Sequence, residues 1–310
     1  MELEHNQIGA TAVGVRAIGP EQLQRFMQVL REYKTGKAST ENRIIASESW
    51  WKLRNTEEEQ KQTNIGADGG FTSKSGWLHN VIVSKHADAM ESYPEPNILP
   101  REKGDRDEAQ MLSAIIPCIM EQNHFEATYS TAMWQKFKTG TGAYKVVWDK
   151  NKLNGLGDIA VECVSLLNVY WEPGITDIQK SRYFFQTELI DKKLLEEQYP
   201  FLADKLKGNT FTSSKFLYDD TISTANKHTV IEVYYHKFVD GRKTLQYCKF
   251  VEDQVLYATE NDTEVPTQLI NDPVTGLPTE VQTELSMAEA GLYDHGLYPY
   301  VLDPLFPIEG

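Results

Sequence analysis

Residues 138–148 read KTGTGAYKVVW, and the fold is decided here because a helical repeat gives way to a strand repeat. The preceding segment, 105–138, repeats apolar residues every three or four positions, which predicts a helix. From Ala143 to Trp148 the pattern is that of a strand. A phosphate-binding loop requires a strand before its glycines and a helix after them, and the order here is the reverse. The sequence therefore predicts an α+β protein in which Gly140-Thr141-Gly142 ends a helix.

Toward the N-terminus the sequence predicts a series of helices. The 105–138 region has acidic residues in its first turn, and we expect a kink near Pro117 or a break near Asn123. A helix from Gly76 to Ala89 should stop at Tyr93-Pro94-Glu95-Pro96. Two more helices are expected before it. The first begins at Pro20 and ends at Gly36, with Leu23, Phe26, Met27, Leu30 and Tyr33 on one face, and the second follows Ser39-Thr40 and carries Ile44, Trp50 and Trp51.

Toward the C-terminus the sequence is mainly that of strands. Asp240-Gly241 is a hairpin signal between two of them. The predicted strands are 143–148 paired with 159–166, then 181–189, 229–239, 244–250 and 255–258, with a short helix over 191–198. Together with the helices, this predicts long N-terminal helices packed on a mainly antiparallel β-sheet.

Composition excludes several classes of protein. The 310 residues are 40% hydrophobic and 25% charged, as in an ordinary globular protein. No apolar run approaches the ~18 residues of a membrane span, and the acidic N-terminus is unlike a secretory signal, so we expect folding in a cytoplasm. The net charge of −14 argues against tight binding of nucleic acid. It does not argue against contact with nucleic acid, because a surface that repels phosphate weakly would let a strand pass without holding it.

No residue pattern predicts catalysis, a cofactor or a metal site. The seven histidines include no H-x-H or H-x-x-x-H pair, and Cys118, Cys163 and Cys248 are widely spaced, so we expect three reduced and mostly buried thiols. Acidic groups such as Asp219 and Asp220 are more often solvated faces or helix caps than two-metal sites. A metal-dependent hydrolase assembled from distant residues stays open as an alternative.

Tryptophan is the unusual chemical feature of the chain. Trp50 and Trp51 are adjacent on a predicted helix and cannot share one face, so they need two packing partners. An interface between subunits or domains explains this about as well as a helix enclosed within one domain. The candidate interface residues are Trp50, Trp51, Trp77 and Trp134.

Several motifs, taken in order, resemble the portal proteins of tailed bacteriophages. They include Ser75-Gly76-Trp77-Leu78-His79-Asn80 and Trp171-Glu172-Pro173-Gly174-Ile175. Tyr33-x-x-Gly36-Lys37 and Trp50-Trp51-Lys52-Leu53-Arg54 resemble the first helical part of such proteins in phages of Gram-positive bacteria. The resemblance is firm over about residues 20–200 and loose beyond.

The resemblance implies a structural subunit rather than an enzyme. Portal proteins form homo-oligomeric rings, typically dodecamers, through which double-stranded DNA enters and leaves the virion. They act with scaffold, major capsid, terminase and head-tail adaptor proteins, and bind no membrane and no cofactor. The expected location is the portal vertex of the capsid, with assembly in the host cytoplasm. An unrelated phage or host protein-interaction domain is the main alternative.

Composition and periodicity also predict an organisation in segments. These are a flexible glycine-rich arm over 1–19, a helical segment and loop over 20–75, an α+β domain over 76–260 that the resemblance identifies as wing-like, and an extended surface excursion over 261–310 that leads into a truncated stem. The apolar ending from Tyr298 to Gly310 is expected to be an element cut short before the stem. The chain would then be the wing portion, monomeric or weakly associating by itself, whereas a longer version would form closed rings.

Overall fold

Helices and antiparallel sheets together build the chain, which confirms the predicted α+β class. The structure, a computed structural model, describes residues 17–52, 76–214, 224, 226–239, 241–265, 267–271, 278–282 and 285–306, with only the backbone of 267–271 and 278–282. It divides into two compact units. The first contains Met1–Gly36 and Tyr170–Tyr298, and the second contains Lys37–Val169 and Pro299–Gly310. The segments predicted from the sequence have other boundaries and stay a prediction.

The first unit is organised on a five-stranded sheet with the strands in chain order. Neighbouring strands β4 to β7 pair antiparallel. The strands are β3 (Val169–Trp171), β4 (Tyr183–Asp191), β5 (Lys227–Val239), β6 (Arg242–Val251) and β7 (Gln254–Ala258). The predicted 181–189, 229–239, 244–250 and 255–258 strands are thus confirmed. Val239 pairs with Arg242, so Gly241, with φ +79°, lies in a two-residue hairpin turn as expected.

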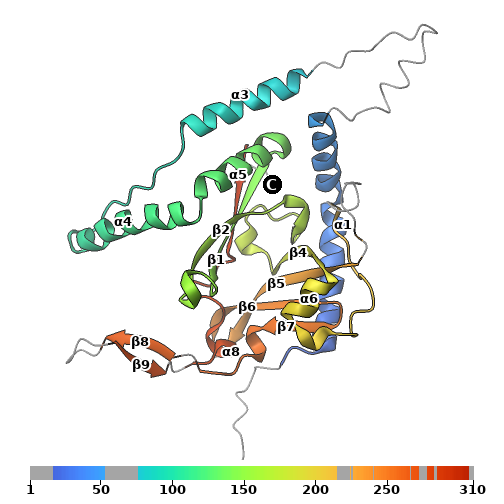
Figure 1. Cartoon of the computed structure of the whole chain (residues 1–310), viewed down its shortest axis with the longest axis vertical. Coiled ribbons are helices and arrows are strands. Elements are labelled where there is room, and N and C mark those ends of the chain that lie inside the picture. The colour runs from blue at the N-terminus through green and yellow to red at the C-terminus, as the bar shows by residue number, and fades with distance from the viewer. Residues whose placement is uncertain are drawn as a thin grey trace, which may run out of the picture. The chain divides into compact units, whose positions relative to one another are not determined.

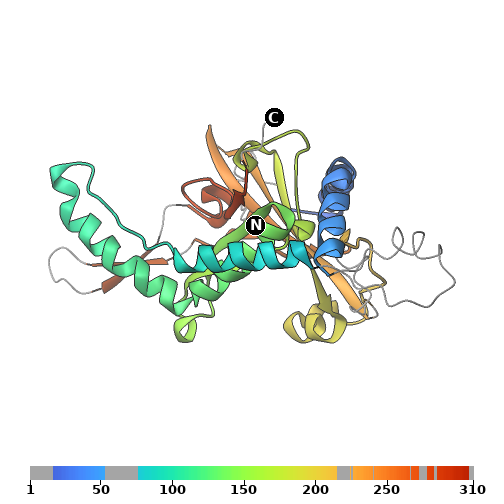
Figure 2. The same cartoon turned by 90° about the horizontal axis from the view of Figure 1, so that it is seen from above.

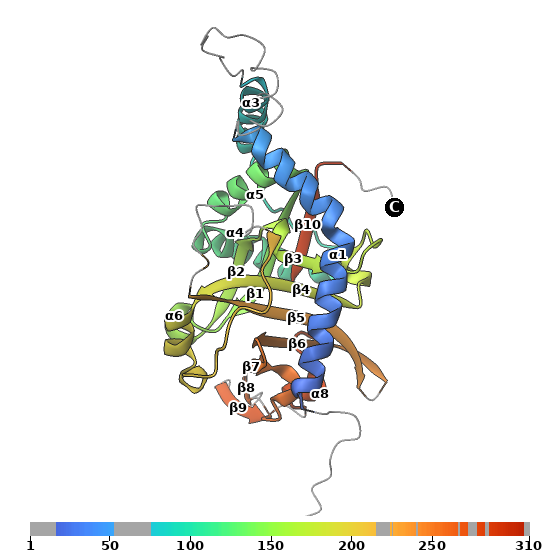
Figure 3. The same cartoon turned by 90° about the vertical axis from the view of Figure 1, so that its right-hand side faces the viewer.

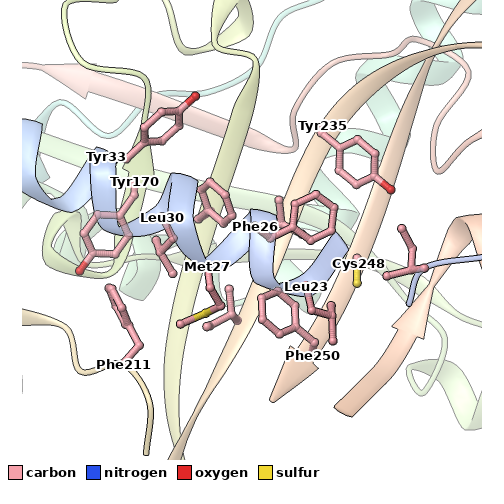
Figure 4. Packing of buried hydrophobic residues seen from close by; sticks show 14 of the residues in the cluster. Leu23, Phe26, Met27, Leu30, Tyr33, Tyr170, Phe211, Tyr235, Cys248 and Phe250 are labelled. Atoms are coloured by element: carbon pink, nitrogen blue, oxygen red, sulfur yellow. The ribbon is translucent and has the colours of Figure 1, made fainter. Parts of the chain in front are cut away.

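Helix α1 (Pro20–Trp51) lays its first half across this sheet (Figure 3). Phe26 lies over the strands, its ring centroid 5.2 Å from that of Tyr235, and Leu30 is fully buried. Figure 4 shows these side chains pointing from the helix toward the sheet. Burial of one such side chain contributes roughly 2 kcal/mol. The predicted packing of an N-terminal helix on an antiparallel sheet is therefore confirmed.

The expected stop at Gly36 is wrong, because α1 runs unbroken through Gly36, Ser39 and Thr40. Glycine at position 36 allows close packing and does not end the helix. A Cβ at position 36 would lie 2.8 Å from Pro173 Cβ and closer still to Pro173 Cγ. The residue is small because the helix backbone approaches Pro173 closely, so a residue typical of helix ends lies in a helix interior.

Two segments that the sequence predicts to lie outside the core, the arm and the excursion, contribute buried residues to the first unit. Ile18 is buried, and its N–H donates to Asn261 Oδ1 at 2.6 Å, so the predicted arm includes a residue of the core. Residues 1–16 lie outside the described part of the chain. The predicted excursion contains the β8 (Thr267–Asn271) and β9 (Pro278–Gln282) hairpin and helix α8 (Met287–Ala290), in which Ala288 is buried. It is therefore not entirely a surface segment. The predicted short helix is α6 (Lys192–Gln198), capped by the Asp191 carboxylate.

The second unit combines three helices with a three-stranded antiparallel sheet (Figure 1). The sheet has the order β10 (Tyr300–Pro304), β1 (Thr141–Asp149), β2 (Asp158–Cys163), so the predicted pairing of 143–148 with 159–166 is confirmed apart from its last residues. The apolar segment after Tyr298, expected to be a truncated element, forms β10 and pairs with β1 from Thr141 to Lys145. Its apolar residues therefore have a partner strand within the chain.

The helices of this unit are α3 (Trp77–Glu91), α4 (Arg106–Gln122) and α5 (Phe125–Thr139). α3 ends before the prolines, as predicted, and the expected break falls at Asn123-His124, where the chain changes direction (Figure 2). His124 has φ +48°, and Asn123 Nδ2 donates to Ile119 O and Ile159 O. Gly140, with φ +93°, ends α5 as expected. The predicted loop over 55–75 lies outside the described residues.

Short single turns of 3-10 helix complete the described structure. They are η1 (Lys103–Asp105), η2 (Leu153–Gly155), η3 (Leu166–Asn168), η4 (Ile178–Lys180), η5 (Pro200–Leu202) and η6 (Thr259–Asn261).

The close approach of Gly36 to Pro173 gives a test of the α1 correction. Alanine favours a helix interior over glycine by ~1 kcal/mol, so helix propensity alone predicts that Gly36→Ala stabilises the protein. We expect the reverse, a loss of about 1–3 kcal/mol in the free energy of unfolding, because the new Cβ overpacks against Pro173. Urea denaturation measures this. In a Pro173→Ala background the same change should cost less. Gly104→Ala, which meets no atom within 4 Å, is the control; a stabilising Gly36→Ala would contradict the account.

Candidate functional site

A stack of two indole rings between two imidazole rings joins α3 and α5 to the second half of α1 in the second unit. Trp51 of α1 stacks on His79 of α3, with ring centroids 4.1 Å apart. Trp134 of α5 lies 5.4 Å from Trp51 and stacks on His86 of α3 at 3.9 Å with an interplanar angle of 12°. His79 and His86 are seven residues apart and so share one helix face. The stack attaches α3 to α1 and α5.

A charged pair lies beside the stack. Lys138 Nζ is 3.0 Å from Glu48 Oε1 and 5.8 Å from the centre of the Trp51 ring. His86 Nε2 also lies 3.1 Å from Ser130 Oγ. An ammonium over an indole ring and a partly buried ion pair both stabilise this arrangement. The stack is therefore a rigid junction of side chains and not an open aromatic surface.

The four predicted interface tryptophans separate into two groups. Trp51 and Trp134 belong to the stack, whereas Trp50 and Trp77 are exposed, by 54% and 78% respectively. The two adjacent tryptophans do lie on different helix faces, and of the two only Trp51 has an aromatic partner among the described residues. That these residues contact another subunit stays a prediction. The stacking histidines were missed by the sequence reasoning, although their spacing was visible.

An acidic groove lies between the end of α3, α4 and the start of α5, with a volume of about 820 Å³. Its apolar wall contains Tyr93, Phe125 and the prolines 94, 96 and 117, and its acidic side chains are Glu95, Glu121 and Glu126. Burial, followed by the charge of Glu126, raises the pKa of Tyr93 above its usual range, so this phenol stays neutral. We call this the acidic groove. It has the size and the mixed lining of a binding site.

A second groove, of about 730 Å³, follows the first half of α1 in the first unit. Arg31 and Thr35 line one side, and Lys207 and Glu252 the other. Glu252 is engaged, because its carboxylate lies 2.7 Å from His228 Nδ1 and accepts from the backbone N–H groups of Lys207 and Gly208. These bonds give the acid a structural task and leave the groove without a reactive group.

Lys37 is a buried amine in the second unit. Its Nζ donates to the carbonyl oxygens of Leu166 and Val169. Burial lowers the pKa of Lys37 to about 7, although the nearby carboxylate of Glu41 opposes the shift. A neutral amine has two N–H donors, which match the two carbonyls. The pattern of α1 gave no signal for this role, since lysines on helices are normally solvated.

The described residues show no cluster of side chains typical of metal binding. Over those ranges, no group of three or more His, Cys, Asp or Glu side chains could hold a metal ion. The expectation of mostly buried thiols is wrong for Cys118, which is exposed on α4, whereas Cys163 is half-buried and Cys248 buried. No helix in the described part of the chain is long and apolar enough to cross a membrane.

Comparison with known proteins decides the family. The model of the phage P22-like portal protein family matches residues 87–307, which contain the acidic groove and every strand of the described sheets. The chain belongs to this family. A search of curated proteins finds no match. The match includes residues 200–307, where the sequence resemblance was loose, and excludes the motifs at 33–54 on which that resemblance partly rested. Portal proteins of this family are structural rather than enzymatic.

The aromatic stack predicts how firmly α3 of the portal chain is held. Trp134→Leu removes the one ring contact that Trp134 makes with α3, its stacking on His86, which is worth roughly 1 kcal/mol, so local opening of α3 should become easier by about 1 kcal/mol. Amide hydrogen exchange in α3 would then be roughly fivefold faster, with little change in β4 and β5. Trp77→Leu, the same change at an exposed position, is the control. Unchanged exchange in α3 would show that the stack does not hold it.

The buried amine predicts a pH dependence of stability. Between pH 7 and about 9.5 the unfolded chain binds a proton at Lys37 that the folded chain lacks, so this residue makes stability rise with pH, by at most ~1.4 kcal/mol per unit. Replacement by Lys37→Met should remove that rise and stabilise the protein most near pH 7. Urea denaturation at several pH values measures it. Lys34→Met, on the same helix, should leave the slope unchanged; equal slopes for all three proteins would contradict the assignment.

Proposed function

We propose that the chain is a structural subunit of a phage portal ring, which serves as the conduit for packaging and ejection of double-stranded DNA. The observation that carries this proposal is the family match over residues 87–307. Closed rings form when one surface of a subunit binds a different surface of the next and the rotation closes. The α+β units correspond in this proposal to the wing, outside the channel, and the ring has about twelve copies, as the family resemblance implies.

The negative charge of the chain supports a role in which DNA passes the ring without being bound tightly. A net charge of −14 disfavours tight attraction to phosphate, and attraction at every step would slow translocation. The ring would act at the portal vertex of the virion after assembly in the host cytoplasm. Its partners would be scaffold, major capsid and head-tail adaptor proteins, and the terminase motor, which would supply the ATP hydrolysis that the portal chain lacks.

Electron microscopy of the complete gene product tests this proposal. We expect closed rings with a central channel, formed by the purified protein alone or on addition of its scaffold protein, because a portal subunit closes on itself by repeated contacts. Metal analysis of the same sample should find no stoichiometric zinc or manganese. A protein that stays monomeric at every concentration and with scaffold present would overturn the ring, and a stoichiometric metal would favour the hydrolase alternative.

A further inference from the structure

The β5–β6 turn of the first unit presents an aromatic side chain and two cations to solvent. Phe238 is 74% exposed and pairs across the hairpin with Lys243, so the phenyl ring and the ammonium lie on the same face. Arg242 is exposed beside them. Over residues 237–243 the sequence KFVDGRK has three basic residues and one acidic residue. A large apolar side chain at a hairpin turn lacks a core to fill, which is typical of a contact residue.

The two cations of this turn have no carboxylate partner among the described residues. Lys237, by contrast, forms an ion pair with Glu260, its Nζ 2.5 Å from Oε2. Arg242 and Lys243 are both exposed, and the guanidinium of Arg242 can bind a carboxylate through two parallel hydrogen bonds. In a protein of net charge −14, such a basic and aromatic turn differs from most of the surface.

The acidic groove offers the complementary chemistry. Glu95, Glu121 and Glu126 form no ion pair with any Lys or Arg in the described ranges, and all three are exposed. The apolar wall of Tyr93, Phe125 and three prolines suits an aromatic ring. Because the prolines fix their backbone angles, the groove is formed in advance and loses little entropy when it is filled.

We propose that the β5–β6 turn of one copy of this chain docks into the acidic groove of a neighbouring copy, with Phe238 against the apolar wall and Arg242 and Lys243 facing the carboxylates. The occupant is a second copy because one sequence carries both complementary surfaces. The two surfaces consist of different residues, so the contact is head-to-tail and each copy can use both at once. This inference rests on the proposed ring and names one of its contacts.

Charge reversal in solution tests the contact. The double variant Arg242→Glu/Lys243→Glu places acids against the acidic groove, and Glu121→Lys/Glu126→Lys places cations against the basic turn. Each should associate about a hundredfold more weakly than the unaltered protein in sedimentation equilibrium, because like charges across an interface strongly disfavour binding. Combining all four substitutions in one chain should restore association. Lys150→Glu/Lys193→Glu, which makes the same change in net charge at exposed sites elsewhere, should have little effect.

Mixing the two double variants tests the head-to-tail geometry. The turn of the groove variant and the groove of the turn variant are both unaltered, so they form the native contact. The acidic turn of the turn variant meets the basic groove of the groove variant, so the second contact also pairs opposite charges. Each variant alone should stay largely unassociated, whereas the mixture should associate and grow beyond dimers by alternation of the two variants. A mixture that associates no better than either variant alone, or association of either variant alone at the unaltered strength, would overturn the inference.

A cross-link separates this inference from the ring itself. In a Cys118→Ser background, Phe238→Cys in one copy should form a disulfide with Pro96→Cys in another under mild oxidation, whereas Phe238→Cys with Lys150→Cys should not. Rings without this cross-link would overturn the contact and leave the ring proposal intact. The cross-link in a protein that never forms rings would support the contact and overturn the ring.

Discussion

The packing of the first half of α1 on the five-stranded sheet is the interaction on which the first unit depends. Phe26 and Leu30 fill the space above strands that come from residues 169–258, and no other described helix covers them in this way. Removing water from this aromatic and aliphatic surface is a large favourable contribution to folding. The close packing of α1 also involves the helix backbone outside the core. This backbone can approach Pro173 only because residue 36 has no side chain.

Several buried polar groups of the first unit are satisfied by acids and carbonyls. The Glu260 carboxylate accepts from the Tyr235 hydroxyl and pairs with Lys237, and burial together with this charge raises the pKa of Tyr235 well above its usual range. The Tyr298 hydroxyl donates to the carbonyl of Ser181. Buried hydroxyls need such partners because an unsatisfied one costs about 1–3 kcal/mol. These bonds attach Glu260 and Tyr298 to the sheet, and the polar sequence between them gave no sign of it.

Much of the secondary structure could be predicted from the sequence, whereas the groove and the side-chain contacts between distant segments could not. The Pro94 and Pro96 pair predicted where α3 ends, because proline cannot continue a helix, but the groove exists only where Phe125 and Pro117 meet those prolines in space. Trp51 and Trp134 were correctly singled out as unusual. Their partners, His79 and His86, could not be named, because the choice of which helix faces meet is made by packing between distant segments.

The sequence by itself determined the class of fold, most element boundaries and the family resemblance, because periodicity, prolines and glycines act over a few residues. Tertiary structure decided that Gly36 belongs to a helix interior, that Lys37 is a buried amine, and that the last apolar segment is a strand of the second sheet. Each of these outcomes depends on a contact with residues more than a hundred positions away. Local propensity is worth at most ~1 kcal/mol per residue, so such contacts override it.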